Sequence, residues 1–191
     1  FLTGYTVRAE APVGDGAESG YRTFLHRYSF SHPQVQRGDE WDVIDLDGLP
    51  LQRHPGRPEV PVRMARLLLP AGYKVVDVQV EAGPEHVLEG TYRIAPAPYP
   101  VPLSSDGPFP ERAYSSQEPF PDVPAGREAV QAKRGYRVLL VPLYPVRYDP
   151  SSGRISYYER LTVRARLRWS ESLSISGLRA PGLRRRDGES L

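Results

Sequence analysis

The sequence contains no cysteine among its 191 residues. This excludes disulfide bonds, thiolate metal ligands and a cysteine nucleophile within the chain. It does not fix the compartment, because a chain of this length can bury a core large enough for export without disulfides. No apolar run approaches the roughly 20 residues that span a membrane. The N-terminus, FLTGYTVRAEAP, also lacks the basic start and apolar core of a signal peptide, so we expect any export signal to lie outside this sequence.

An excess of charge of one sign is also missing. The 25 basic and 23 acidic residues give a net charge of +2, so charge gives no reason to expect a nucleic acid or a membrane as partner. Groups for catalysis or metal binding are scarce, since no Gly-rich phosphate loop precedes a helix and the four histidines are far apart: His26, His32, His54 and His86. A calcium-like group, Asp42, Asp45 and Asp47, lacks the spacing of a known loop, and the edge of a hairpin explains it equally well. We expect no enzyme activity, no cofactor and no metal.

Proline is what the sequence has in quantity. The 21 prolines are about twice the average usage, and 12 tyrosines accompany them. Proline is excluded from helix interiors and central strands, whereas tyrosine favours strands. No amphipathic helical stretch is visible, and only residues 128–133 have the character of a single helical turn. The composition therefore predicts an all-β fold, an antiparallel β-sandwich of jelly-roll-like or immunoglobulin-like kind with about eight to ten strands and little or no helix.

The clearest strand pattern spans residues 135–169. From Ile155 onward apolar residues hold most odd positions, while arginines and one threonine hold the even positions from Arg160 to Arg168. This period of two indicates a strand with one buried face. Because Asp149 to Gly153 reads DPSSG, which has turn chemistry, we predict one long antiparallel hairpin. The arginine face is interpreted as a charged sheet edge rather than a nucleic-acid patch, because no aromatic residues alternate with the arginines.

Further strands are predicted along the chain. Residues 21–30 alternate, with Phe24, His26 and Tyr28 on one face. Residues 60–69 and 73–81 flank Pro70-Ala-Gly72 and are expected to form a second hairpin, and residues 87–94 a short strand.

Regular patterning stops between Pro96 and Arg134, a segment with nine prolines. A loop of this length is usually functional or disordered. Aromatic residues are available to anchor it, so we expect an ordered, extended, Pro-rich loop. After Trp169 the sequence is rich in Ser, Gly and Arg and has no apolar pattern. We therefore expect a β-sandwich domain over residues 1–170 and a flexible basic tail over residues 171–191.

Two ordered blocks of sequence have a familiar form. The first is GRPEVP at residues 56–61, followed by a strand that ends in Leu-Pro-Ala-Gly at 69–72 and by Ile-Ala-Pro at 94–96. The second is Arg134-Gly135, followed by PLYPVRYDPSSGRISYY at 142–158. Together they resemble the propeptide of gingipain-type cysteine peptidases, with Asp149 where that family has Asn. The resemblance implies a β-sandwich prodomain, N-terminal to the catalytic domain of a secreted peptidase, that silences the zymogen and assists its folding.

The resemblance also implies an inhibitory segment soon after the Ile-Ala-Pro block, with a basic residue that enters the specificity pocket. Counting onward from Pro96 leads to three residues that are not basic: Leu103, Ser104 and Ser105. The next basic residue is Arg112. Either Arg112 enters the pocket in a shifted register, or the peptidase prefers a different side chain; an ordinary solvated role for Arg112 is the alternative. A Pro-rich segment suits such a task, because it is already extended and lacks backbone donors.

Processing is expected in the tail, since the family separates prodomain and catalytic domain after a basic residue. The candidate processing site is the run Arg184, Arg185 and Arg186. The alternative is that this run is an ordinary basic surface segment with no role in processing. The expected partner is the cognate catalytic domain, and the expected location is secreted, periplasmic or cell-surface. The alternative function is an adhesion or carbohydrate-binding module, in which Trp41 and Trp169 would form a sugar-stacking surface.

Overall fold

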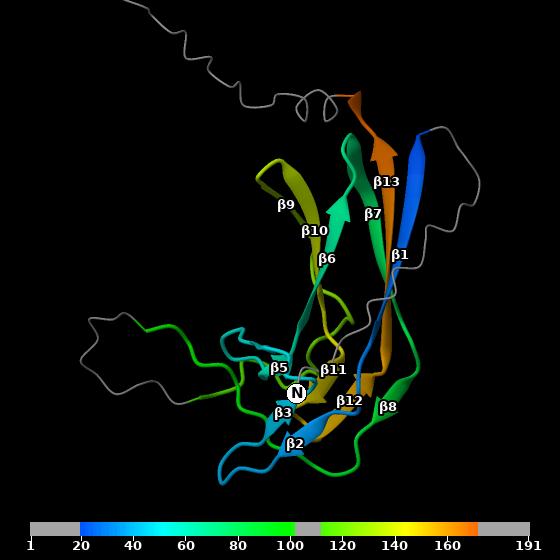
Figure 1. Cartoon of the computed structure of the whole chain (residues 1–191). Coiled ribbons are helices and arrows are strands. Elements are labelled where there is room, and N and C mark those ends of the chain that lie inside the picture. Colours follow the sequence, from blue (N-terminus) through cyan, green and yellow to red (C-terminus); the bar gives the residue numbers. More distant parts are fainter. Residues whose placement is uncertain (1–19, 102–111, 172–191) are drawn as a thin grey trace, which may run out of the picture.

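The computed structural model describes residues 20–101 and 112–171. These residues form thirteen β-strands that are grouped around two hydrophobic cores (Figure 1). The prediction of an all-β fold is confirmed. The strands outnumber the expected eight to ten because several contain only two or three residues. None of the helices within the described ranges has the length and apolar character needed to cross a membrane.

The first lobe, which we name the sandwich, consists of two three-stranded antiparallel sheets. One sheet has the order β1 (Tyr21–Ser29), β13 (Arg160–Trp169), β7 (Tyr73–Ala82), and the other β6 (Arg63–Leu69), β10 (Tyr136–Leu143), β9 (Ala129–Lys133). Both sheets contribute to one core: Ala65, Leu69, Leu139, Val141, Leu143, Leu161, Val163, Ala165 and Leu167. The odd positions of residues 161–167, predicted to be buried, line this core.

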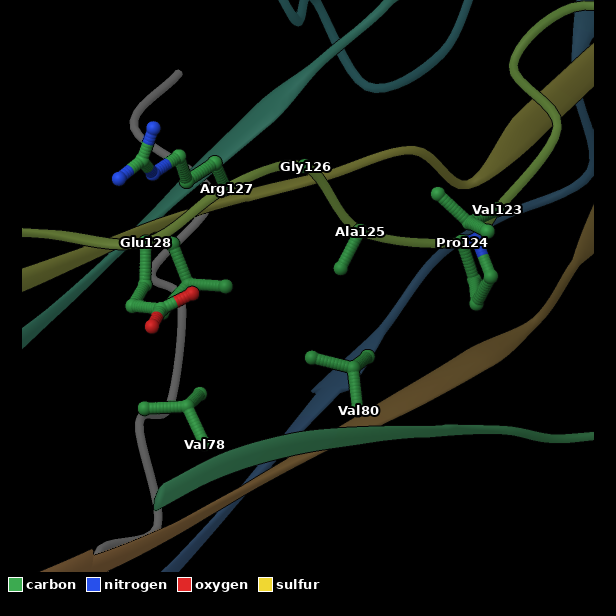
Figure 2. Close-up of a pocket in the computed structure, with 9 residues that line it drawn as sticks. Val78, Val80, Val123, Pro124, Ala125, Gly126, Arg127 and Glu128 are labelled. Atoms are coloured by element: carbon green, nitrogen blue, oxygen red, sulfur yellow. The ribbon is translucent and has the colours of Figure 1, made fainter. Parts of the chain in front are cut away.

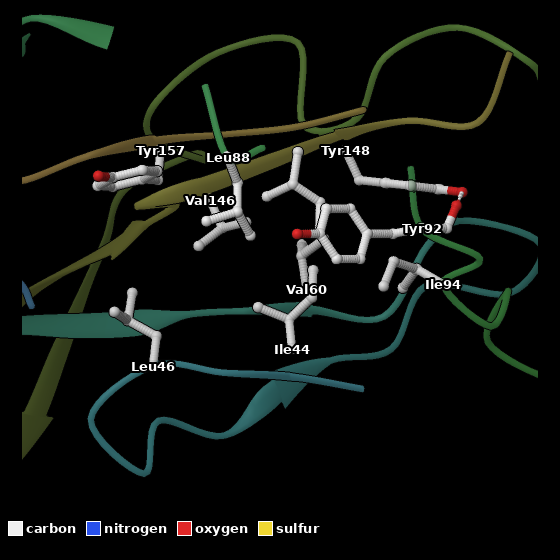
Figure 3. Packing of buried hydrophobic residues seen from close by; sticks show 10 residues of the cluster. Ile44, Leu46, Val60, Leu88, Tyr92, Ile94, Val146, Tyr148 and Tyr157 are labelled. Carbon is white, nitrogen blue, oxygen red and sulfur yellow. Dashed lines mark hydrogen bonds between the residues drawn. The ribbon is translucent and has the colours of Figure 1, made fainter. Parts of the chain in front are cut away.

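The second lobe, which we name the stem lobe, consists of short strands. A three-stranded sheet has the order β11 (Val146–Asp149), β12 (Arg154–Tyr158), β8 (Glu85–Val87). Two separate two-stranded sheets accompany it: β2 (Gln34–Gln36) with β3 (Val43–Asp45), and β4 (Leu51–Gln52) with β5 (Val60–Pro61). Figure 3 shows their shared core, formed by Ile44, Leu46, Val60, Leu88, Tyr92, Ile94, Val146, Tyr148, Ile155 and Tyr157. Phe30 packs against both cores and so connects the two lobes.

The predicted long hairpin over residues 135–169 forms only at its tip. Strands β11 and β12 pair across the Asp149–Gly153 turn, with Tyr148 opposite Ile155. Beyond the tip, β10 and β13 enter opposite sheets. The prediction was wrong there because alternation shows which face of a strand is buried, but does not show which strand lies beside it.

The second predicted hairpin is also wrong. Strand β6 pairs with β10, and β7 pairs with β13, so residues 70–72 are a corner between the two sheets. The predicted strand over 87–94 is reduced to β8 and a single bridge between Ile94 and Asp42.

Strand β9 replaces the helical turn expected at residues 128–133. It joins β10 through the two-residue turn Arg134–Gly135, whose φ angles are 51° and 81°. Two positive φ values are the signature of a type I′ hairpin turn, whose twist matches that of the strands it connects. The turn therefore selects a strand over a helix, and the Pro-rich loop ends earlier than expected.

The arginine face of β13 is not a sheet edge. Strand β13 is the central strand of its sheet, between β1 and β7. Its arginines face solvent, where Arg164 lies 3.3 Å from Glu81 and the guanidinium of Arg166 lies 4.5 Å from the ring centroid of Tyr21. The face is therefore a solvated sheet surface with local partners.

Candidate functional site

The most distinctive feature of the stem lobe is the base of the Pro-rich loop. Ala97, before the loop, and Ser115, after it, both form hydrogen bonds with the backbone at Gly56 and Arg57. Gly56 N donates to Ala97 O (2.9 Å) and Ala97 N donates to Arg57 O (2.8 Å), while Ser115 N donates to Gly56 O (2.8 Å). The Ser115 hydroxyl donates to Gly56 O as well (3.0 Å). We name this group, Gly56, Arg57, Ala97 and Ser115, the loop stem; it holds the two ends of segment 98–113 together.

Gly56 is the residue that allows the loop stem to close. Its φ is +71°, a conformation that residues with a side chain rarely adopt. A Cβ at this position would lie 2.5 Å from the Tyr99 hydroxyl and 2.8 Å from the Ser115 Cβ. The first residue of the GRPEVP block therefore has a physical role, which is to let both ends of the loop approach the backbone.

A buried carboxylate fixes the chain just before the loop. Asp42, the one buried charged residue among the described ranges, accepts hydrogen bonds from Arg93 N (2.8 Å) and from Arg37 Nη1 (3.0 Å). Asp42 N also donates to Arg93 O (2.7 Å). A buried charge with this many partners is satisfied and rigid. It bridges to Ile94 at the start of the Ile-Ala-Pro block, so Asp42 anchors the chain at this position.

Tyr114 fixes the chain just after the loop. Its hydroxyl donates to Ile94 O, and its ring packs against the core of the stem lobe. The pKa of the Tyr114 phenol is raised, mainly by burial and to a smaller extent by the neighbouring Tyr148. The phenol therefore remains a neutral hydrogen-bond donor. Phe120 continues the anchoring, because its backbone N and O each pair with Tyr148 at 2.8 Å. The expectation that aromatic residues anchor the Pro-rich segment is correct for these two.

Arg112 lies at the downstream end of the loop, beside the loop stem. Its Nη1 is 3.9 Å from Glu59 Oε1, and Arg53 Nε lies 3.4 Å from the same oxygen. The side chain of Arg112 is 43 % exposed, so its long ion pair with Glu59 contributes at most about 1 kcal/mol. Arg112 is available to a partner. Leu103, Ser104 and Ser105, and the predicted processing residues Arg184, Arg185 and Arg186, lie outside the described residues.

A pocket of about 330 Å³ lies at one open edge of the sandwich (Figure 2). Val78 and Val80 of β7 form one wall, and residues 123–128, which lead into β9, form the other. Most of its lining residues have apolar side chains, and Arg127 and Glu128 are the charged members. The described residues contain no group of three or more His, Asp or Glu side chains placed to hold a metal ion. The pocket therefore has neither a catalytic arrangement nor a metal centre.

The two tryptophans do not form a common surface. Trp41 lies in the stem lobe, with its ring 6.4 Å from the ring of Tyr114 and under the guanidinium of Arg93. Trp169 ends β13 in the sandwich, with its ring 5.3 Å from the ring of Tyr73. A sugar-stacking platform that uses both residues is therefore excluded.

The sequence comparisons agree with this geometry. The Propeptide_C25 family model matches residues 34–173, which is most of the chain and includes the loop stem. The chain belongs to this propeptide family. The prediction of a non-catalytic propeptide of a gingipain-type cysteine peptidase is confirmed. No curated protein sequence matches the propeptide.

Two solved structures from Porphyromonas gingivalis share the fold of this propeptide. One is a complex of the RgpB pro- and mature domains, with a TM-score of 0.56, 16 % identity, and coverage of 81 % of this chain and 83 % of that chain. The other is from a study of the zymogenic latency of gingipain K, with a TM-score of 0.58, 20 % identity, and coverage of 78 % of this chain and 88 % of that chain. At these identities the likeness establishes the fold.

Sequence reasoning identified the loop but missed its supports. Aromatic residues were expected to anchor the loop, whereas Glu59, Asp42 and the bonds made by Ser115 were not given these roles. The one available signal was Gly56 in the GRPEVP block. The contacts join residues that are 41 and 59 positions apart, as Gly56 with Ala97 and Ser115 with Gly56, and no local pattern reports such pairs.

Proposed function

We propose that this propeptide keeps the catalytic domain of its precursor inactive by placing segment 98–113 in the active-site cleft, and that it assists the folding of that domain. The observation that carries the proposal is the loop stem, which fixes both ends of the segment at Gly56. The structures of the RgpB pro- and mature domains and of zymogenic gingipain K support it, because they connect the same fold with a peptidase partner and with latency.

Fixing the ends of the segment favours tight inhibition for a physical reason. A loop that is ordered only upon binding loses conformational entropy at that moment, whereas a loop with fixed ends and prolines has lost part of it on folding. The segment has prolines at positions 98, 100, 102, 108 and 110. Proline favours extended backbone and lacks the amide donor that a substrate offers to a peptidase.

We further propose that the propeptide is secreted or displayed at the cell surface, and the kind of peptidase that carries such a propeptide supports this. The absence of cysteine is compatible with this route, because the two cores supply the stability that disulfides give smaller exported domains. We place the processing cut at Arg184, Arg185 or Arg186, and peptide sequencing of the mature catalytic domain tests this placement.

Inhibition in trans tests the central proposal. The 191-residue chain is added to the mature peptidase that its precursor encodes, and residual activity is titrated against propeptide concentration. Inhibition by the unmodified chain is expected, and its absence at micromolar concentration would contradict the proposal.

Two variants of the loop, Arg112→Ala and a triple glycine variant of residues 103–105, then locate the residue that enters the specificity pocket. If Arg112 enters it, Arg112→Ala weakens inhibition by more than about tenfold, because a central anchor is lost. The matched control is Arg53→Ala, which removes the other partner of Glu59 outside the loop. If Arg112→Ala and Arg53→Ala both inhibit like the unmodified chain, the residue that enters the pocket is Leu103, Ser104 or Ser105. The triple glycine variant of these three residues should then lose inhibition.

A folding test uses the precursor. Expression of the catalytic domain alone and with the propeptide should give soluble, activatable peptidase only in the second case. Equal yields would show that the propeptide inhibits without assisting folding.

A further inference from the structure

The outer face of the β6–β10–β9 sheet is apolar and open to solvent. Residues directly opposite one another in a sheet share a face, so the register places Leu68, Val138 and Gln131 in one row, Arg66, Leu140 and Ala129 in the next, and Met64 with Pro142 in the last. Tyr136 begins β10 on the same face. We name this set of nine residues the docking face.

Exposure on this face is high for large apolar side chains. Leu68 is 63 %, Tyr136 66 % and Met64 37 % exposed, while Val138, Leu140 and Pro142 are half-buried. Arg66 is the one charged residue of the set. Contiguous exposed apolar surface of this kind marks an interaction site in proteins.

The opposite outer surface of the sandwich shows that this composition is not a general property of the fold. On the β1–β13–β7 sheet, charged residues hold most of the exposed positions of β13 and β7, and Leu25 of β1, opposite Arg164, is an exposed apolar member of the same face. The charged members are Arg160, Arg164, Arg166, Arg168, Lys74, Asp77 and Glu81. The same architecture therefore presents one charged face and one apolar face.

The docking face follows the loop stem closely along the chain. Glu59, which contacts Arg112, is followed by β5 and then by β6, where Met64 begins the face five residues later. Figure 1 shows the described ends of the loop and the β6–β10–β9 sheet on the same side of the molecule, away from β1 and β13. A partner that takes the loop into its cleft therefore approaches this side.

A stable protein interface contains more residues than the loop can supply. A standard protein interface uses roughly 20–30 residues a side. Segment 98–113 has 16 residues, so the body of the propeptide must add roughly 4 to 14 more. The docking face offers nine, in the chemistry typical of an interface core.

We infer that the docking face binds the catalytic domain of the precursor and holds it while the loop occupies the cleft. This inference rests on the proposed function and names the second surface of the same interaction. The matching surface of the catalytic domain is apolar and beside the cleft, since burying a charge against Leu68 and Tyr136 would be unfavourable.

The test compares two exposed leucines on opposite faces of the sandwich. Leu68→Lys places a charge in the docking face, whereas Leu25→Lys places one opposite Arg164 on the charged face, where Leu25 is 44 % exposed. In the trans assay with the full chain, Leu68→Lys should weaken inhibition by about tenfold or more, mainly through faster dissociation, and Leu25→Lys by less than about twofold. Thermal unfolding of both variants verifies that each is folded.

A labelling measurement keeps the inference testable if Leu68→Lys fails to fold. Because the chain has no cysteine, Leu68→Cys and Leu25→Cys each introduce a single thiol. Intact-mass analysis of the propeptide after maleimide treatment should show Leu68→Cys protected in the complex and Leu25→Cys labelled at the free rate.

The outcomes separate this inference from the proposed function. If the unmodified chain does not inhibit, the proposed function fails. If the unmodified chain inhibits, but Leu68→Lys does not weaken inhibition and Leu68→Cys is not protected from maleimide in the complex, only the role of the docking face is overturned. If Leu68→Lys instead abolishes self-association of the free chain and leaves inhibition unchanged, the face binds a second copy, which also overturns the inference.

Discussion

The sandwich and the stem lobe solve the problem of burying a core in different ways. The sandwich uses long strands with alternating apolar residues, and its core consists of aliphatic side chains. The stem lobe uses strands of two to five residues, and its core contains three tyrosines, including Tyr148, whose hydroxyl donates to Tyr92 O (2.8 Å). Regular strands satisfy their own backbone groups, whereas short strands need side chains and loops to do so. The irregular lobe needs such additional anchors, and for this reason it can also fix the ends of a functional loop.

The largest expected effect comes from the cores. Leu139→Ala in the sandwich and Leu46→Ala in the stem lobe each remove a side chain that is at most 1 % exposed. Each should lower the free energy of unfolding by about 2–5 kcal/mol, measured by urea denaturation. Inhibition at a temperature where both are folded should suffer more for Leu46→Ala, because Leu46 supports the lobe that holds the loop stem. Equal inhibition by the two variants would show that the lobes act as one unit.

A smaller expected effect on stability, with a large one on function, comes from Gly56→Ala. The positive φ alone should reduce stability by about 1–3 kcal/mol, and the contacts with Tyr99 and Ser115 should displace the ends of the loop. Inhibition should fall by more than about tenfold in the trans assay.

Gly48→Ala is the matched control for Gly56→Ala. Gly48 has a φ of +64° but no atom within 4 Å of an added Cβ, and it lies in the turn between β3 and β4, outside the loop stem and the docking face. This variant should lose a similar amount of stability and retain inhibition. Loss of inhibition in Gly48→Ala would mean that backbone strain, and not the loop stem, controls the loop.

The smallest expected effect concerns the turn between β11 and β12. Hydrogen bonds from the Ser152 and Ser151 hydroxyls hold the pKa of Asp149 below its ordinary value. A carboxyl with a lowered pKa in the folded state stabilises the fold above its unfolded pKa of about 3.9, and this stabilisation is lost as the pH falls below that value. Stability measured by denaturant titration should therefore depend less on pH between 5 and 3 in Asp149→Asn than in the unmodified chain. An unchanged pH dependence would assign the acid sensitivity to other carboxyls.

Local features of this protein could be predicted from neighbouring residues alone. Alternation from Ile155 to Leu167 identified the buried side of β12 and β13, because a strand repeats every two residues whatever lies beside it. The DPSSG turn, the Pro-rich loop and the GRPEVP block also depend on neighbouring residues, and the ordered blocks were sufficient to indicate the propeptide family.

Which strands are neighbours, and which residues support the loop, became visible only in the folded chain. Strands β10 and β13 were expected to pair but face each other across the core, since alternation carries no information about the partner strand. The meeting of Gly56, Ala97 and Ser115, and the alignment of Met64, Leu68 and Val138 on one open face, depend on strand register between distant segments. Such register is fixed only when the two cores are packed, and this is why the loop stem and the docking face emerge from the folded chain.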